Sequence, residues 1–282
     1  MQHIHTKEDV YTKHMPRGGA YEPDRLDNQF DFITKCELPI LLNFLNSYTV
    51  NRAIGFHLYP SIARKLPPNA RIADIATGTG IYLTQLAESW PEATLDGYDL
   101  SAVQYPEATS LPSNVKLKLL DVKKPVPQEL EGTYDLVHNL AKLLKPGGAL
   151  QWEECNYLAA PQVRSLVGST YSAIQKIEEL LLDAFRVHFV TEWNTLPREM
   201  TDSGLVNVQH DVVSSDREPE TRAGITKNSM VACFGWARSG KDPVPLSPAE
   251  IDELEHQAYN DIESGGYVRY DIHTTVGFQA EA

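Results

Sequence analysis

The chain has 282 residues and a mass of 31.5 kDa, a length that predicts one α/β domain with appended helices. Hydrophobic residues make up 42% of the chain, which provides for a sizeable core and argues against wholesale disorder. With 38 acidic and 25 basic residues, the formal net charge is −13. Such a surface repels nucleic acid phosphates and anionic membranes, so we expect neither as a partner.

The cysteine usage fits a reducing compartment, and the apolar segments are too short to cross a membrane. Cys36, Cys155 and Cys233 are odd in number and widely spaced, which fits neither a disulfide framework nor a zinc site. The polar start, 1–10, carries no secretory segment, and the most apolar run, 38–45, is far below the roughly 20 residues that span a bilayer. The sequence therefore predicts a soluble, cytoplasmic protein.

The first 65 residues predict an arm followed by helices. Residues 1–22 are polar, and the spacing of the apolar residues after Pro23 is typical of an amphipathic helix. The apolar stretch 40–65 is expected to be helical in pieces.

From residue 66 the pattern changes to short apolar runs that alternate with helical segments. Strands are predicted over 71–76, 93–100, 115–120, 133–138, 149–153, 206–213 and 267–280. Helices are predicted over 81–90, 139–144, 167–190 and 248–263, the last with a capping box formed by Ser247 and Glu250. Strands that alternate with helices pair in parallel, so we expect an α/β fold: a doubly wound, Rossmann-like, seven-stranded and mostly parallel sheet.

The strongest motif is Asp-Ile-Ala-Thr-Gly-Thr-Gly at 74–80, between a predicted strand and a predicted helix. Small residues there let the backbone approach a ligand, and a helix N-terminus offers free N–H groups to an anion. A P-loop is excluded because Ile81 and Tyr82 follow the last glycine. A dinucleotide fingerprint is disfavoured because Leu83 stands where a third small residue is needed. Taken alone, the motif fits a plain strand-to-helix turn equally well.

Acids at the ends of the next two strands strengthen the ligand interpretation. Asp99 lies 19 residues beyond Gly80, where an acid can bind both hydroxyls of a ribose. Asp121 follows the third strand, where it can accept from an adenine amine while the N–H of Val122 reaches a ring nitrogen. Finally, residues 143–150 form a helix stop that leads into a strand. Each feature alone is weak, because acids at strand ends are usually just solvated, but all four in this order form a strong signal.

At this point the sequence resembles the class I S-adenosylmethionine-dependent methyltransferases, and within them the fungal secondary-metabolism branch of LaeA-like and UMTA-like proteins. The matching stretches cover most of the chain and are 25–29, 66–80, 97–101, 134–138, 144–154 and 265–273. The resemblance implies S-adenosyl-L-methionine as the cofactor and S-adenosyl-L-homocysteine as the product. The residues implied to bind it are Asp74, Ala76, Thr77, Gly78, Thr79 and Gly80 for the methionine end, Asp99 and Leu100 for the ribose, and Asp121 and Val122 for the adenine. Ala76 replaces the first loop glycine of the family, as it often does in this branch.

The same resemblance divides the chain into three parts. Residues 66–155 would form the cofactor-binding core, and 1–65 would contribute to the cover of the active site. Residues 156–282 would supply a helical substrate cover together with the last strands of the sheet.

Methyl transfer from a sulfonium is an in-line displacement, and it needs a base only when the acceptor must lose a proton. The candidate base is His138, at the carboxyl end of the fourth strand; the alternative is a histidine that packs or lines the cofactor. His188 and His273 are expected to be structural, and no metal site is predicted, His3 and His5 included.

Two further groups of side chains are expected near the acceptor or on the surface. The aromatics placed around an apolar or heterocyclic acceptor are Trp152, Trp193, Trp236, Tyr171 and Phe185. Glu153 and Glu154 are expected to follow the fifth strand as a solvated pair, with binding of an acceptor amine as the alternative.

The sequence thus predicts a methyltransferase that acts on N or O of a small fungal secondary metabolite. One alternative is a LaeA-like regulator that works through protein partners, and another is a cofactor-binding enzyme that catalyses a rearrangement without methylation. A closed pocket would favour the enzyme, and an open cofactor face with an exposed apolar patch would favour the regulator.

The link between the fourth and fifth strands is unexpectedly short. A parallel crossover with its helix needs at least about 10–12 residues, and only 139–148 are present. We therefore expect that a mobile, substrate-gating segment at about 137–140 is missing from the sequence. If the chain is instead continuous there, the site is more open than in its relatives and the regulator gains support.

Overall fold

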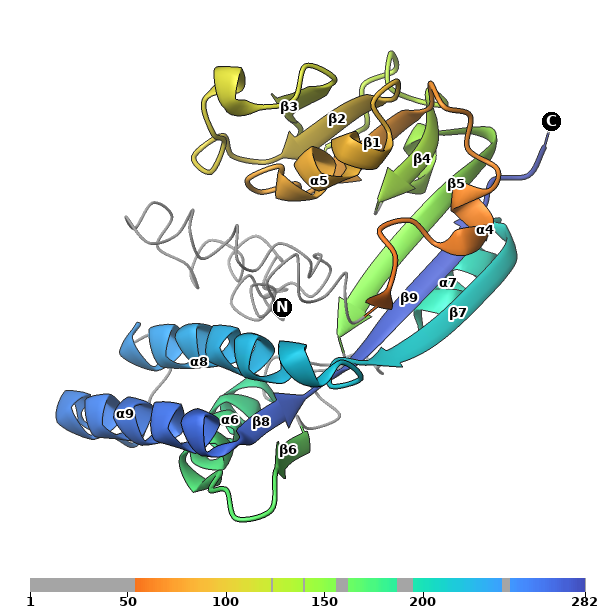
Figure 1. Ribbon diagram of the computed structural model, residues 1–282. Helices are drawn as coiled ribbons and strands as arrows, with labels where there is room; N and C mark the ends of the chain where they lie inside the picture. The colour runs from red at the N-terminus through yellow and green to blue at the C-terminus, as the bar shows by residue number, and fades with distance from the viewer. Residues whose placement is uncertain are drawn as a thin grey trace, which may run out of the picture.

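The computed structural model describes residues 54–122, 124–138, 140–155, 162–186, 195–239 and 244–281 (Figure 1). The predictions for residues 1–53 and for His188 and Trp193 lie outside these residues.

Seven strands form the main sheet, in the order β3-β2-β1-β4-β5-β9-β7. They are β1 (Arg71–Ile75), β2 (Thr94–Asp99), β3 (Val115–Leu119), β4 (Tyr134–His138), β5 (Leu144–Cys155), β7 (Val206–Ser214) and β9 (Asp271–Phe278). Only β9 runs antiparallel to its two neighbours, and β1 to β5 are all parallel. The predicted doubly wound, mostly parallel seven-stranded α/β sheet is confirmed.

Helices surround this sheet and form a separate group at one end of β5 and β9 (Figure 1). The helices are α4 (Pro60–Ala63), α5 (Ile81–Ser89), α6 (Ser172–Arg186), α7 (Leu196–Asp202), α8 (Arg222–Arg238) and α9 (Pro248–Ser264), with single 3₁₀ turns η1 (Ala108–Ser110), η2 (Ala141–Leu143) and η3 (Pro219–Thr221). The group at the end contains α6, α8 and α9 with a two-stranded sheet of β6 (Gln162–Ser165) and β8 (Gly266–Arg269). The capping box before α9 is confirmed, because Ser247 Oγ accepts from Glu250 N while Glu250 Oε2 accepts from Ser247 N.

Three apolar clusters hold these parts together. One lies between the sheet and α5, and we call this side the α5 face; it carries Ile72 and Leu136 from the sheet and Leu83 from the helix. A second cluster covers the opposite face, where Val137 packs in one cluster with Met200 of α7. The third is the core of the helical group. The sheet is therefore buried on both faces, as its parallel strands require.

The last predicted strand, 267–280, is in fact two strands in two different sheets. β8 pairs with β6 in the small sheet and β9 pairs with β5 and β7 in the main one. The chain changes sheet at Tyr270, whose N–H donates to Ser215 Oγ at 2.8 Å and whose carbonyl accepts from Ser215 N at 2.8 Å. Alternation of apolar residues predicts extended backbone, but it carries no information on the pairing partner.

The link from β4 to β5 is short, and the expectation of a missing segment at about 137–140 stays a prediction, since residue 139 lies outside the described residues. The predicted helix 139–144 is a single 3₁₀ turn, η2. Thr133 N donates to the carbonyl oxygen of Leu143 at 2.9 Å, so the link runs back beside the start of β4. β5 then begins at Leu144, five residues earlier than predicted, because 145–148 form a bulge within it.

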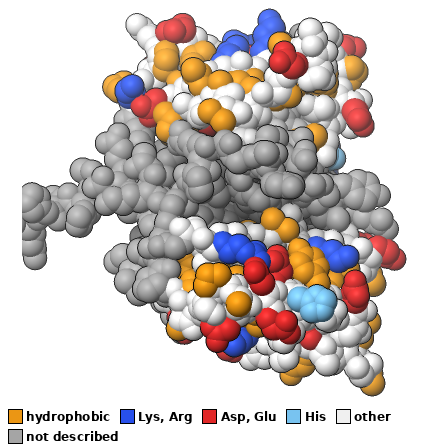
Figure 2. Space-filling model, turned by 90° about the vertical axis from the view of Figure 1, so that its left-hand side faces the viewer, with side chains coloured by type: hydrophobic (Ala, Val, Ile, Leu, Met, Phe, Trp, Pro, Cys, Tyr) orange, Lys and Arg blue, Asp and Glu red, His pale blue; other side chains and the backbone are white. Residues whose placement is uncertain are grey.

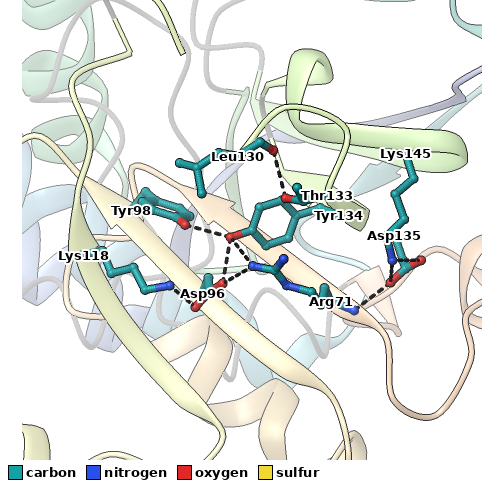
Figure 3. Close-up of polar contacts among 9 residues, drawn as sticks. All are labelled: Arg71, Asp96, Tyr98, Lys118, Leu130, Thr133, Tyr134, Asp135 and Lys145. Atoms are coloured by element: carbon teal, nitrogen blue, oxygen red, sulfur yellow. Dashed lines mark hydrogen bonds and ion pairs between the residues drawn. The ribbon is translucent and has the colours of Figure 1, made fainter. Parts of the chain in front are cut away.

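A buried polar cluster joins the four strands β1 to β4 (Figure 3). Asp96 of β2 is 1% exposed. Its carboxylate accepts from Arg71 Nη2 at 3.2 Å, from Lys118 Nζ at 2.6 Å and from the Tyr134 hydroxyl at 2.7 Å. Tyr98 is hydrogen-bonded to the same Tyr134 hydroxyl at 2.7 Å. In the described residues, no helix lies between β3 and β4 in the chain. The bonds of this cluster connect the strands on either side of that link.

Candidate active site

The loop after β1 has the backbone shape that the 74–80 motif predicts. Ala76, Gly78 and Gly80 all have positive φ, at 64°, 56° and 76°. A Cβ on Gly80 would lie 2.8 Å from Leu117 Cδ2, and its φ of 76° is strained for other residues, so both features favour glycine at this position. A Cβ on Gly78 would meet nothing within 4 Å, so the backbone of this residue borders open space in which a ligand can lie.

Asp99 is held at the end of β2 so that it faces this loop. Its Oδ2 accepts from Gly78 N at 3.0 Å, and its Oδ1 accepts from Ser101 N at 3.1 Å. A carboxylate offers about four lone-pair sites, so both oxygens keep capacity for ribose hydroxyls. The structure thus brings Asp99 and the loop together as the sequence predicts.

The predicted adenine side lies beyond β3. Asp121 is two residues past the end of the strand and forms an ion pair with Lys124 at 3.3 Å. Exposed apolar side chains gather here, at the carboxyl ends of β2 and β3: Leu100, Val103, Leu119 and Val122. Figure 2, which shows the molecule from the side of β3 and α9, has apolar side chains on the described surface of its upper part. An aromatic ring placed against such side chains would bury them.

Asp74 lies at the inner end of the site and has the properties of a cation-binding group. It is fully buried, and neither carboxylate oxygen has a partner at hydrogen-bond distance within the described residues. Burial raises the pKa of Asp74 to about 7, with a smaller raise from Asp99 and an opposing effect of the nearby Thr77 hydroxyl. The ammonium of a bound amino acid would satisfy this carboxylate. Together with Gly78 and Asp99, Asp74 fits the methionine and ribose parts of S-adenosyl-L-methionine.

His138 stands beside Asp74 in the sheet, because the β1–β4 register pairs these two residues. It is fully buried, and its Nε2 lies 2.7 Å from the Tyr82 hydroxyl, which also donates to the carbonyl oxygen of His57 at 3.0 Å. A hydroxyl has only one hydrogen to donate, so we assign the His138 tautomer with the proton on Nε2, which donates to the Tyr82 oxygen. The strand-end placement agrees with the prediction, while the role of His138 as a base stays a prediction.

Glu153 contradicts its predicted environment. β5 continues to Cys155, so Glu153 lies within the strand, and it is 4% exposed rather than solvated. Burial raises the pKa of Glu153 to about 8, and the charge of Asp74 adds to the rise, while the hydrogen bond from Gln151 opposes it. The strand alternation that puts Ala149 on the α5 face also puts Gln151 and Glu153 there, so the sequence gives the direction of these side chains but not their burial.

Gln151 organises the surroundings of Glu153. The register places Gln151 directly opposite His138. Its Nε2 donates to Glu153 Oε1 at 2.7 Å and to the carbonyl oxygen of His57 at 3.1 Å, and its Oε1 accepts from Tyr59 N at 2.8 Å. One carboxamide therefore fixes Glu153 and the segment before α4 on the same face of the sheet.

Two of the five aromatic residues that were predicted to surround the acceptor lie in apolar clusters instead. Trp152 packs on the face opposite α5, and Trp236 lies in the core of the helical group. Large aromatics have a strong tendency to fill cores, which is what decided their positions here. Tyr171 is exposed before α6, and the side chain of Phe185 lies outside the described part.

Two absences hold for the part of the chain that the structure describes. Within 54–281, apart from its undescribed gaps, no group of three or more metal-binding side chains occurs. None of the helices in the same residues is long and apolar enough to cross a membrane.

Comparison with known proteins gives several relatives, although no family model matches the chain. Methyltransferase grgD of a Penicillium species is 37% identical over 110 residues, which cover 30% of this chain and 38% of that protein. N-methyltransferase tcpN of Claviceps purpurea is 24% identical over 236 residues, 71% of this chain and 79% of that protein. Secondary metabolism regulator laeA of Aspergillus niger is 26% identical over 171 residues, 54% of this chain and 44% of that protein.

Similarity to solved structures is weak: a putative sarcosine dimethylglycine methyltransferase from Galdieria sulphuraria has a TM-score of 0.43 at 15% identity, over 76% of this chain and 79% of that one. The strand order, with its one antiparallel strand β9 next to the edge, is that of the class I S-adenosylmethionine-dependent methyltransferase fold. The sequence relatives to which the chain is similar include fungal proteins named methyltransferases and a fungal regulator of secondary metabolism.

Proposed function

We propose that the protein is a methyltransferase that transfers the methyl group of S-adenosyl-L-methionine to N or O of a small secondary metabolite and releases S-adenosyl-L-homocysteine. The observation that carries the proposal is the arrangement around the 74–80 loop. A fully buried, unpartnered Asp74, the open face of Gly78 and the oriented Asp99 carboxylate each suit one part of this cofactor. The relatives named methyltransferases support the same activity.

When bound, the cofactor supplies a methyl group on a positively charged sulfur, already activated for displacement. The protein residues then bind and orient. Asp74 binds the ammonium, Asp99 binds the ribose hydroxyls, and Asp121 together with the N–H of Val122 binds the adenine. Because attack must be in line, this fixed orientation and the exclusion of water are the main contributions of the protein.

The acceptor is proposed to be a small apolar or heterocyclic molecule. The formal net charge of −13 disfavours a nucleic acid acceptor. His138 remains the candidate base for an oxygen acceptor, whose proton must leave, whereas an amine can react in its neutral form.

The proposal is tested in two steps. Calorimetry should give binding of S-adenosyl-L-homocysteine to the purified protein. Incubation with methyl-labelled cofactor and a metabolite extract of the producing organism should then add one labelled methyl group to a metabolite, detected by mass spectrometry. If the protein does not bind S-adenosyl-L-homocysteine, or binds it but labels no metabolite, the proposed methyltransferase activity is contradicted.

A second candidate is a LaeA-like regulator that acts through a protein partner. It is favoured by the short β4–β5 link, since no crossover helix is described between these strands. The similarity to laeA of Aspergillus niger points the same way. The regulator would bind the cofactor and label no metabolite, and a rearrangement enzyme would convert a metabolite without adding mass.

A further inference from the structure

We propose that Glu153 makes the protein select an amine as its methyl acceptor, by binding the acceptor nitrogen on the α5 face of the sheet. This inference rests on the proposed methyl-transfer function and decides between its N and O forms.

The position of Glu153 follows from the strand register. Asp74, His138 and Gln151 lie in one row across β1, β4 and β5. β4 ends at this level and β1 one residue later, whereas β5 continues to Cys155, so Glu153 stands two residues beyond the row on the same face. Ligands of such sheets bind beyond the carboxyl ends of the strands. Glu153 therefore lies beyond the carboxyl ends of β1 and β4, where an acceptor must bind.

The orientation of Glu153 is fixed before any ligand arrives. Its Oε1 accepts from Gln151 Nε2 at 2.7 Å, and the other contacts of Gln151, with the backbone of His57 and Tyr59, prevent that amide from turning. A carboxylate held in this way loses little side-chain entropy when it binds a ligand.

A second buried group next to Glu153 lacks a partner. Thr274 of β9 lies directly opposite Glu153 in the β5–β9 register, so both side chains are on the same face. Thr274 is fully buried, and its hydroxyl has no hydrogen-bond partner among the described residues. Buried polar groups normally form hydrogen bonds, so the unpaired Thr274 hydroxyl indicates that a ligand binds there.

The charge of the site is also incomplete. In the described ranges, no lysine or arginine forms an ion pair with Asp74 or Glu153. Charged buried acids without a cation are costly, which is why burial raises the pKa of both groups. A cationic ligand beside each acid would favour its charged form: the cofactor ammonium at Asp74 and the ammonium of the acceptor at Glu153.

The chemistry of methyl transfer fits this assignment. An ammonium bound to Glu153 first gives one proton to the carboxylate, and the freed lone pair then attacks the methyl carbon. The new N–C bond forms while the C–S bond breaks, with its electron pair going to sulfur. The positive charge moves from sulfur to nitrogen, while Glu153 keeps the proton that it received and is neutral. A phenolate or alkoxide has no such proton to give and would be repelled by the Glu153 carboxylate.

The test compares matched probes, phenethylamine and phenethyl alcohol, on the complex with S-adenosyl-L-homocysteine by calorimetry. We expect the amine to bind and the alcohol to bind at least about tenfold more weakly, since hydrogen bonds to charged groups are the stronger ones. Glu153→Gln should weaken the amine by about tenfold or more and leave the affinity for S-adenosyl-L-homocysteine unchanged. The exposed Glu131→Gln is the matched control and should change neither affinity.

A measurement on the unchanged protein covers the case that Glu153→Gln does not fold. Because the pKa of Glu153 is raised to about 8, its carboxylate is charged above that pH. Alkylamines stay protonated up to about pH 10. Amine affinity should therefore rise from pH 6 to 8.5, whereas alcohol affinity should stay level.

The inference is overturned if wild-type protein with bound S-adenosyl-L-homocysteine binds the alcohol as tightly as the amine, or binds neither. It is also overturned if Glu153→Gln keeps the amine affinity, or if that affinity is level with pH. Failure of the wild-type protein to bind S-adenosyl-L-homocysteine is a different result, which contradicts the proposed function itself.

Discussion

Ala76 adopts a backbone conformation that disfavours any residue with a side chain. Its φ is 64°, in the left-handed region, where an L-residue other than glycine costs roughly 1–2 kcal/mol. We expect Ala76→Gly to raise the free energy of unfolding by about 1 kcal/mol, measured by urea denaturation. Gly78→Ala should lower it by a similar amount, because Gly78 has φ of 56° and open space around its missing Cβ. Equal stabilities of the two variants would contradict this account.

Asp99 links the loop to the strand and is expected to dominate cofactor affinity. Asp99→Ala removes the acceptor of the Gly78 N–H and the proposed ribose contacts together. Charge-assisted bonds contribute about 1.5–3 kcal/mol each, so affinity for S-adenosyl-L-homocysteine should fall at least about tenfold by calorimetry. The exposed Asp202→Ala serves as control. Unchanged affinity in Asp99→Ala would remove Asp99 from the site.

His138 separates two mechanisms. If Glu153 receives the proton of an amine, His138→Ala should reduce turnover less than about tenfold, because its Nε2 is already engaged with Tyr82. A base for an oxygen acceptor would instead cost about 10²–10⁴ in turnover at unchanged cofactor affinity. Turnover and calorimetry on the same variant distinguish these outcomes, and a loss in the larger range would restore His138 as the base.

The strand-end rule made some site residues predictable and left others hidden. Asp99 and His138 each lie at the carboxyl end of a strand that the sequence marks clearly, so their positions could be derived. Glu153 could not, because its burial comes from β9 and from the segment held by Gln151, both far away in sequence. Local pattern gives the direction of a side chain, while distant segments decide whether water reaches it.

At the scale of elements, the Asp96 cluster should set the resistance of the sheet to acid (Figure 3). Burial alone would raise the pKa of Asp96, but hydrogen bonds from Lys118, Tyr134 and Arg71 lower it below its ordinary value. A lowered folded-state pKa stabilises the protein above the unfolded value of about 3.9, and this stabilisation is lost as pH falls through the folded value.

Asp96→Asn tests this linkage. At pH 7 it should lower the free energy of unfolding by about 1–3 kcal/mol, a modest figure because Arg71 and Lys118 are 38% and 41% exposed. Near pH 3 the difference from wild type should shrink. Urea midpoints at the two pH values provide the measurement, with Asp202→Asn as control, and a difference that is equal at both pH values would contradict the linkage.

The strands β1 to β4 were predictable because short apolar runs between turns leave little choice. The predicted helices 139–144 and 167–190 differ from the structure in type or in extent. The first is one 3₁₀ turn, since the link must return directly to the start of β4, and the second begins only at Ser172. The helix α8 was not predicted as such, because its exposed stripe contains Gly224, Val231 and Gly235 and its buried side contains Thr226 and Asn228, so polarity does not follow the helical period.

At the scale of the whole molecule, the helical group has a core of its own that protects one thiol. Cys233 of α8 is fully buried, and burial raises its thiol pKa well above the ordinary value, with Glu178 adding to the rise. We expect iodoacetamide to label Cys233 only when the protein unfolds, so that labelling followed by mass spectrometry rises with the urea unfolding curve. Labelling in buffer at the rate of a free thiol would contradict a closed helical core.

The place of β9 between β5 and β7 has a consequence for synthesis on the ribosome. β1 to β5 can pair as they emerge, but β5 then presents an open edge until β9 is made, from residue 155 to residue 278. At roughly 5–20 residues per second, this edge stays unpaired for about 6–25 s. An exposed edge of that length attracts other chains. The yield of folded protein should therefore depend on how fast the ribosome completes the chain and on chaperones that occupy the edge meanwhile.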